Sequence, residues 1–257
     1  MQEVPSMWVA QGVSGDGQVV LGRTGDSDTQ ARRWSQTGGT QGFGPLSGTP
    51  LGLGWAASAY ASNTDGSLIT GYARVTISNV PIPQVISTPF VWDAVNGART
   101  IPLANGSLPA ALATDMNPAG TVIVGVDITQ PVARLFRWSQ PTGYQFFGVT
   151  SDINEVSAIP RTSADGNAVV AGLNYWSPST GVITIQQLLT QSGCTFTGWT
   201  ITGAAGISDD GLTIAGNGVS PTGQTQAWIA TVPSPGAGVA GVAVLACRTL
   251  RRRRCGG

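Results

Sequence analysis

Aspartate recurs at one position of a repeated turn, each time directly before a glycine, at Asp16, Asp65, Asp165 and Asp210. Carboxylates in such a series could bind calcium or the hydroxyl groups of a sugar. Cleavage of a glycosidic bond would need two opposed carboxyl groups, yet the chain has only two glutamates, Glu3 and Glu155, and several aspartates in turns. A structural role explains the aspartates better, because a turn carboxylate accepts backbone N–H groups. The third repeat has Asn117-Pro118-Ala119-Gly120 there, so the repeat does not require a carboxylate.

Tryptophan is the second recurrent side chain with chemistry of its own, at Trp34, Trp92, Trp138, Trp176 and Trp228. An accessible indole can stack on a sugar, whereas a buried indole fills the space between sheets. Packing between repeats is the favoured interpretation of these residues.

Histidine is absent, which removes the usual general base near neutral pH and the commonest metal ligand. Cys194 is alone in the body of the chain and no CxxC pair is present, so neither a zinc site nor a disulfide framework is indicated. Cys194 is expected to be a small, buried or half-buried side chain. The sequence therefore predicts no catalytic residue, no metal site, no cofactor and a chain that is not an enzyme.

Five segments share one pattern: a small or polar approach, a turn ending in glycine, a short apolar run and a second glycine. They cover residues 12–22, 61–71, 114–125, 161–172 and 205–216. The turn glycines are Gly17, Gly66, Gly120, Gly166 and Gly211, spaced 45 to 54 residues apart. The second glycines are Gly22, Gly71, Gly125, Gly172 and Gly216. A tryptophan-centred element follows each segment, and in the first four repeats a glycine-containing turn and another short run come after it.

Each repeat is expected to form two hairpins, that is four strands. Asp-Gly between extended runs predicts a type I′ turn with positive φ at both central residues, and Asn96-Gly97 offers the same chemistry for the second hairpin of repeat two. The runs VVL, TVIV and NAVV are β-branched and too short for helices. Four strands in roughly 50 residues is the size of a propeller blade. The sequence predicts an all-β, propeller-like domain of about five four-stranded repeats over residues 1–232.

Two features depart from a regular ring of such repeats. Residues 75–89, rich in proline and β-branched side chains, are expected to form a projecting loop or an extension of a sheet edge. Repeat five stops at Val232 without a fourth strand. Either the N-terminal stretch completes that sheet, or the ring is incomplete and further repeats precede this chain.

The alternation of turn segments with Phe-Arg-Trp-like elements resembles the HAF family of extracellular repeats. Residues 12–22, 135–138 and 161–172 carry the likeness best, and it extends over about residues 8–230. The resemblance implies a secreted, propeller-like protein. It implies no particular activity.

Basic charge is concentrated at the end of the chain. All 13 basic residues are arginines, five of them in the last ten residues, so the body carries a net charge of −5. Such a surface repels phosphate, and nucleic acid is therefore not an expected partner.

Residues 233–257 form a separate tail. Pro233 and Pro235 end the last strand, an uncharged run of small residues follows, and a basic cluster closes it: Arg251, Arg252, Arg253 and Arg254. This order resembles the PEP-CTERM type of bacterial sorting signal, although Ser234 stands where that family usually has glutamate. The resemblance implies processing by a sorting transpeptidase after transient contact with the inner membrane.

The uncharged run is short for a membrane anchor. Twelve helical residues would span about 18 Å, against about 30 Å of hydrocarbon, so a transient stop followed by cleavage fits better than a durable anchor. The alternative is a disordered basic tail. The first residues lack the basic and apolar regions of an export signal, so we expect a reading frame that is truncated or misassigned at its N-terminus.

Three functions fit these features. The first is a non-enzymatic secreted or cell-surface repeat protein that binds an extracellular glycan or protein as a matrix or display module. The second is a glycan-binding or sialidase-like propeller, whose Ser14-Gly15-Asp16-Gly17 turn is a poor match to an Asp-box hairpin. The third is a scaffold for protein interactions.

Overall fold

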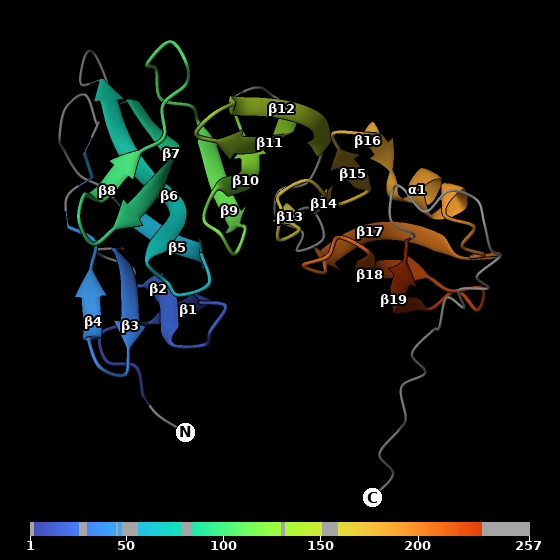
Figure 1. Cartoon of the computed structure of the whole chain (residues 1–257), viewed down its shortest axis with the longest axis horizontal. Coiled ribbons are helices and arrows are strands. Elements are labelled where there is room, and N and C mark those ends of the chain that lie inside the picture. The colour runs from blue at the N-terminus through green and yellow to red at the C-terminus, as the bar shows by residue number, and fades with distance from the viewer. Residues whose placement is uncertain are drawn as a thin grey trace, which may run out of the picture. The chain divides into compact units, whose positions relative to one another are not determined.

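The computed structural model describes residues 3–25, 30–44, 46–47, 56–78, 84–129, 132–150 and 159–232. The chain divides into two compact units, Met1–Ser151 and Asp152–Gly257. Figure 1 shows the strands of both units as small antiparallel sheets that follow one another along the chain. Each unit is described below by itself.

The first unit holds three sheets, each of four consecutive strands paired in chain order. The first sheet comprises β1 (Val9–Val13), β2 (Val19–Arg23), β3 (Ala31–Ser35) and β4 (Gly39–Gly42). The second comprises β5 (Ala56–Ser62), β6 (Leu68–Ser78), β7 (Gln84–Asp93) and β8 (Gly97–Thr100). The third comprises β9 (Ala111–Met116), β10 (Val122–Asp127), β11 (Ala133–Ser139) and β12 (Gly143–Thr150).

The second unit holds one sheet of four strands and one of three. The first comprises β13 (Arg161–Thr162), β14 (Val169–Ala171), β15 (Asn174–Ser177) and β16 (Gly181–Thr184). Helix α1 (Ile185–Gln191) follows, and the last sheet comprises β17 (Thr200–Ile207), β18 (Thr213–Val219) and β19 (Thr225–Thr231).

The predicted fold class is confirmed: the chain is nearly all-β and propeller-like, with one sheet for each of the five sequence repeats. Within the described ranges repeat five ends after its third strand, as the sequence indicated. The insertion at residues 75–89 lengthens the β6–β7 hairpin, whose strands pair from Leu68↔Asp93 to Ser78↔Gln84. Residues 79–83 lie outside the described ranges.

The last short run of repeat four, which was expected to be a strand, is a strand only in its first part. Residues 182–189 continue the expected strand only to Thr184, and α1 begins directly after it. Thr184 caps the helix by accepting the N–H of Gln187, and the Gln187 side chain accepts the N–H of Thr184 in return. This capping box stabilises the first helical turn against continuation of the strand. Ile185, Leu188 and Leu189 bury the apolar side of the helix.

The first hairpin of each repeat uses a different turn from the one predicted. All five turn glycines have positive φ, between 67° and 74°, but no aspartate in the described part of the chain does. The N–H of Gly17 bonds to the Ser14 carbonyl, and the N–H of Ser14 bonds to the Val19 carbonyl. Glycine therefore ends a wider loop in the left-handed conformation, and the type I′ prediction is wrong.

The second hairpins also have wider loops than Asn96-Gly97 suggested. Asp93 pairs with Gly97 across a three-residue loop, and the φ of Gly97 is 68° while that of Asn96 is not positive. Gly39, Gly143 and Gly181 occupy the same place in their repeats, with φ from 62° to 64°. A three-residue loop with one left-handed glycine explains all four hairpins.

The second glycine of the repeat lies where the first two strands approach most closely. Four of the five pair with an alanine of the first strand next to a bulge: Gly22 with Ala10, Gly71 with Ala59, Gly125 with Ala113 and Gly216 with Ala204. Gly172 differs, because it lies outside the named strands and forms an isolated bridge with Ala204. A Cβ at any of these four positions would overlap a backbone carbonyl oxygen of the first strand. The sequence repeat is therefore a steric requirement of the bulged pair.

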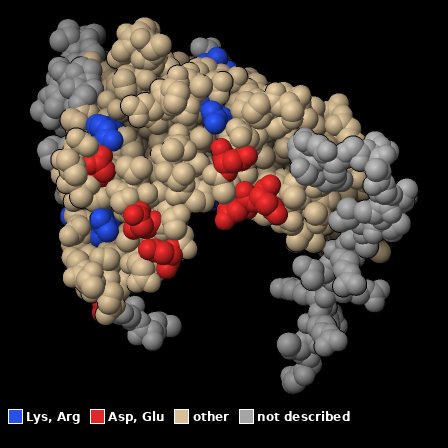
Figure 2. Space-filling model, viewed as in Figure 1, with Lys and Arg blue, Asp and Glu red and all other residues tan. Residues whose placement is uncertain are grey.

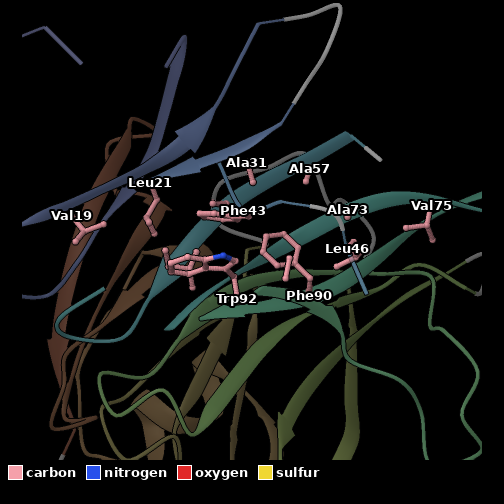
Figure 3. Close-up of a cluster of buried hydrophobic side chains, with 13 residues drawn as sticks. Val19, Leu21, Ala31, Phe43, Leu46, Ala57, Ala73, Val75, Phe90 and Trp92 are labelled. Atoms are coloured by element: carbon pink, nitrogen blue, oxygen red, sulfur yellow. The ribbon is translucent and has the colours of Figure 1, made fainter. Parts of the chain in front are cut away.

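Apolar side chains of neighbouring sheets form the cores. In the first unit one cluster joins the first two sheets through Leu21, Phe43, Ile69, Phe90 and Trp92; Figure 3 shows Phe43, Phe90 and Trp92 together at its centre. A second cluster contains Ile101, Ile123 and Phe136. In the second unit Ile185, Ile214 and Trp228 belong to a core that also includes the buried Cys194.

Candidate functional site

The recurrent aspartates stabilise the turns that contain them. The Ser163 hydroxyl donates to Asp165 Oδ1 at 2.6 Å and accepts the Ala168 N–H at 3.0 Å, while Asp165 accepts the Asn167 N–H at 2.9 Å. The turns at Asp16 and Asp210 repeat this network with Ser14 and Ser208. In repeat three Asn117 takes the place of this serine–aspartate network, because its Oδ1 accepts two backbone N–H groups. The predicted structural role of the carboxylates is confirmed.

Hydrogen bonding also sets the protonation of these carboxyl groups. The Ser14 hydroxyl, then the Gln18 N–H, lowers the pKa of Asp16. The Ser208 hydroxyl and the Leu212 N–H act on Asp210 in the same way. These aspartates remain anionic at neutral pH, and Oδ1 of each accepts hydrogen bonds from groups of its own turn.

Consecutive turns within a unit are linked through their backbones. Asp16 N–H bonds to the Thr64 carbonyl, Thr64 N–H to the Pro118 carbonyl, and Ala164 N–H to the Asp209 carbonyl. The carboxylates consequently form small groups, visible in red in Figure 2. In the described part of the chain no group of three or more acidic, cysteine or histidine side chains has the arrangement of a metal site.

The tryptophans divide into two positions when strand register is compared. Trp34, Trp92, Trp138 and Trp176 each pair with a valine or isoleucine of the second strand. Trp228 pairs with Gly216 instead, two residues earlier in the repeat, where repeats two and three have Phe90 and Phe136. The grouping of all five as one position was therefore wrong for Trp228.

At the junction of repeats one and two the tryptophan is closed off by its neighbours. Trp92 is 6% exposed. The Phe43 ring stacks on it with centroids 4.9 Å apart and an interplanar angle of 22°. The Arg33 guanidinium carbon lies 5.3 Å from the ring centroid. Trp92 is a packing residue, as predicted.

At the junction of repeats two and three the equivalent tryptophan lacks this cover. The register of the paired strands makes Val91 the counterpart of Arg33, and Arg99 the counterpart of Gln41. Two residues after Gln41 and Arg99, the same alignment makes Ile101 the counterpart of Phe43. A branched aliphatic side chain thus stands where an aromatic ring would stack, and Trp138 stays only partly buried.

Two adjoining cavities open over Trp138, of about 410 Å³ and about 610 Å³. Both are lined by Val91, Arg99, Trp138 and Gln140. The smaller cavity extends along Ile101 and Tyr144, and the larger along Leu68, Thr121 and Ile123. We call this space the Trp138 groove. It combines a mostly apolar lining with a few polar side chains, as ligand sites do.

Arg99 is the one charged side chain that lines the described walls of the groove. Its Nη1 donates to Asp93 Oδ2 at 2.5 Å; the Arg99 side chain is 38% exposed and that of Asp93 is 15% exposed. Asp93 lines neither cavity. Burial opposes ionisation of Asp93, but the N–H groups of Asn96 and Val95, the Asn96 amide and Arg99 together hold its pKa well below the usual range. The Asp93 carboxylate, at the β7–β8 turn, therefore holds Nη1 of the Arg99 guanidinium in place.

Tyr144 closes one wall of the groove as a neutral phenol. Its hydroxyl donates to the Ile101 carbonyl at 2.8 Å, and burial, followed by the negative charge of Asp127, raises the pKa of Tyr144. Its ring packs edge-on against Phe136, with centroids 5.2 Å apart. These contacts hold in place the wall that Tyr144 forms next to Trp138, its cross-strand partner.

The residues expected to direct sorting, Pro233, Pro235, Arg251, Arg252, Arg253 and Arg254, lie outside the described ranges. Among the helices that are described, none is long and apolar enough to cross a bilayer. Arg99 and Gln140 were not singled out from the sequence. A comparison of the repeats in register could have found them, because repeat two has Val91 and Ile101 where repeat one has Arg33 and Phe43.

The sequence matches no protein-family model and no curated protein. Solved structures are nevertheless similar. Dipeptidyl peptidase 4 of Porphyromonas gingivalis matches with a TM-score of 0.52 and 9% identity, over 89% of this chain and 38% of that chain. TolB of Acinetobacter baumannii matches with a TM-score of 0.48 and 12% identity, over 85% of this chain and 51% of that chain. A chain of a nidogen/laminin complex matches with a TM-score of 0.49 and 10% identity, over 90% and 78%.

The β-propeller domain of the Trilobed protease from Pyrococcus furiosus is also similar, with a TM-score of 0.36 and 12% identity, over 68% of this chain and 69% of that chain. All of these similarities concern the fold. This chain spans about half of the TolB chain and about two-fifths of the dipeptidyl peptidase.

The prediction that the chain is not an enzyme is overturned by the same comparison. A dipeptidyl peptidase is among the structures that share the fold. The lack of histidine excludes mechanisms that need an imidazole base, but it does not place a chain of this fold outside the enzymes.

Proposed function

We propose that the chain is an extracellular binding module whose ligand lies in the Trp138 groove. The observation that carries this proposal is the contrast between two equivalent residues. Trp92 is covered by Phe43 and Arg33, whereas Trp138 faces two cavities. Packing alone would favour a large side chain at residue 101, because voids in a core reduce stability.

The chemistry of the groove fits a ligand with both apolar and polar faces. An indole offers a broad surface at little cost in conformational entropy. Arg99, Gln140 and Thr121 offer hydrogen-bonding groups around it. The wall formed by Val91, Ile101 and Tyr144 excludes water from one side of such a ligand.

The proposal includes display at a bacterial cell surface through residues 233–257. Its support is the order of Pro233, Pro235, the uncharged run and the arginine cluster, together with the likeness to PEP-CTERM signals and to HAF repeats. A sorting transpeptidase and the inner membrane are the partners that this part of the proposal requires.

Deletion of residues 233–257 is expected to move the protein from the cell surface into the medium, when the chain is expressed behind its host's own export signal. Fractionation with immunoblotting measures the distribution. Replacing Arg251–Arg254 with glutamine in the full chain provides a second variant, because it removes the charge while keeping the tail length. An unchanged distribution in both variants would refute the sorting role and leave the groove proposal untouched.

A further inference from the structure

We infer that the Trp138 groove binds an oligosaccharide that carries a single carboxylate-bearing sugar among neutral ones. This inference rests on the proposed binding function of the groove and assigns the chemical class of its ligand.

The shape of the groove points to a chain-like ligand. The two cavities share Trp138, Val91, Arg99 and Gln140; the smaller also reaches Tyr144 on β12 and the larger Ile123 on β10, the partners of Trp138 on the two strands that flank it. Trp138 therefore lies in the middle of an elongated site. A ligand of several linked rings would place one ring over the indole and its neighbours in the two cavities.

Sugar rings match the alternation of groups along this site. A pyranose has an apolar face of C–H groups that can lie flat on an indole, and a rim of hydroxyl groups that needs hydrogen-bond partners. Trp138, Val91 and Ile101 supply apolar surface. Gln140 and Thr121 supply an amide and a hydroxyl close by, each able to donate and accept.

Arg99 selects for negative charge. Nη1 is held by Asp93, so the guanidinium is oriented before a ligand arrives, and it is the more exposed member of the pair. The remaining N–H groups of a guanidinium suit a carboxylate, since two parallel hydrogen bonds can form. Asp93 does not line the groove, so the charge presented to the ligand is positive.

The number of ligand charges follows from the rest of the surface. Arg99 is the single cation on the described walls of the groove, and the part of the chain before the tail has a net charge of −5. A densely charged polymer, such as nucleic acid or a uniform polyuronate, would be repelled by that surface. One acidic sugar flanked by neutral sugars satisfies both conditions.

The test is isothermal titration calorimetry of the full chain with three probes: glucuronosyl-xylotriose, the methyl ester of the same compound, and xylotetraose. The ester keeps the ring and removes the charge. The acid is expected to bind at least tenfold more tightly than either neutral probe. Binding should weaken as salt rises, because the contact is charge-assisted.

Variants assign the binding to the groove. Trp138→Ala should weaken binding of the acid by about tenfold or more. Arg99→Gln should reduce the acid's affinity to about that of its ester. Trp8→Ala is the matched control, because Trp8 is 76% exposed and lies outside the groove; it should bind like the parent. Trp138→Phe, which retains an aromatic face and most of the packing, keeps the test valid if the alanine variant does not fold.

The outcomes separate the two proposals. Equal binding of acid and ester, lost in Trp138→Ala, would overturn the acidic ligand and retain the groove as the binding site. Binding that survives in Trp138→Ala, Trp138→Phe and Arg99→Gln would overturn the groove itself. Absence of binding for all three probes would overturn the ligand class proposed here.

Discussion

Replacement of Gly216 by alanine is expected to lower the free energy of unfolding by about 3 kcal/mol. The new Cβ would overlap the Gly203 carbonyl oxygen and would lie 2.6 Å from Cζ2 of Trp228. The carbonyl belongs to a paired strand and cannot rotate away, and Trp228 is buried in the core of the second unit. Relief would require separation of β17 from β18.

Gly206→Ala provides the control, because Gly206 lies in the same sheet and a Cβ there meets nothing within 4 Å. Its φ is not in the left-handed region, so the change should be neutral or stabilising by less than about 1 kcal/mol. Urea unfolding of both variants, with unchanged m-values, measures the difference. Equal stability of the two variants would show that close strand approach is not the reason for the second glycine.

The second large effect is expected at Trp92. Trp92→Ala should lower the free energy of unfolding by about 3–5 kcal/mol, because it removes a ring that is 6% exposed and that stacks on Phe43 in the main core of the first unit. Figure 3 shows Trp92 beside Phe43 and Phe90, so its removal would leave a void next to both rings. Phe43 cannot fill it without losing its own contacts.

Trp138→Ala is the matched comparison, since Trp138 has the same place in the next repeat. It should cost clearly less stability than Trp92→Ala, because one face of its indole already borders open space. Thermal unfolding of the two variants side by side measures the difference. A larger loss for Trp138→Ala would mean that both indoles are ordinary packing residues.

The repeat pattern predicted much of the fold because its glycines reflect backbone geometry. All five turn glycines have positive φ, a conformation that glycine adopts at little cost. Within the described ranges repeat five has three strands, as the abrupt change of composition after Val232 predicted. The extended β6–β7 hairpin followed from the β-branched residues inserted at 75–89.

The details that the sequence did not predict depend on side-chain hydrogen bonds and on strand register. The turn type is set by side chains such as Ser163, whose hydroxyl bonds both to Asp165 and to the Ala168 N–H, closing a wider loop than Asp-Gly alone requires. The position of Trp228 depends on its pairing with Gly216, which spacing along the chain does not reveal. Helix α1 forms because Thr184 and Gln187 cap it, although the run that contains them is apolar enough for a strand.

The groove is a case where the residue types were visible but their arrangement was not. Trp138 was one of five recurrent tryptophans, and nothing in its local sequence separates it from Trp92. The difference lies in the preceding repeat, where Val91 and Ile101 replace Arg33 and Phe43 in register. Once two strand pairings are known, this substitution can be read from the sequence alone.

Hydroxyl-radical footprinting of the intact protein, read residue by residue by mass spectrometry, tests the central claim most directly. The claim is that equivalent tryptophans are closed at one junction and open at the next. Trp138 should be oxidised several-fold faster than Trp92, since accessible side-chain area governs attack, and the exposed Trp8 sets the upper limit. Equal protection of Trp138 and Trp92 would contradict the account.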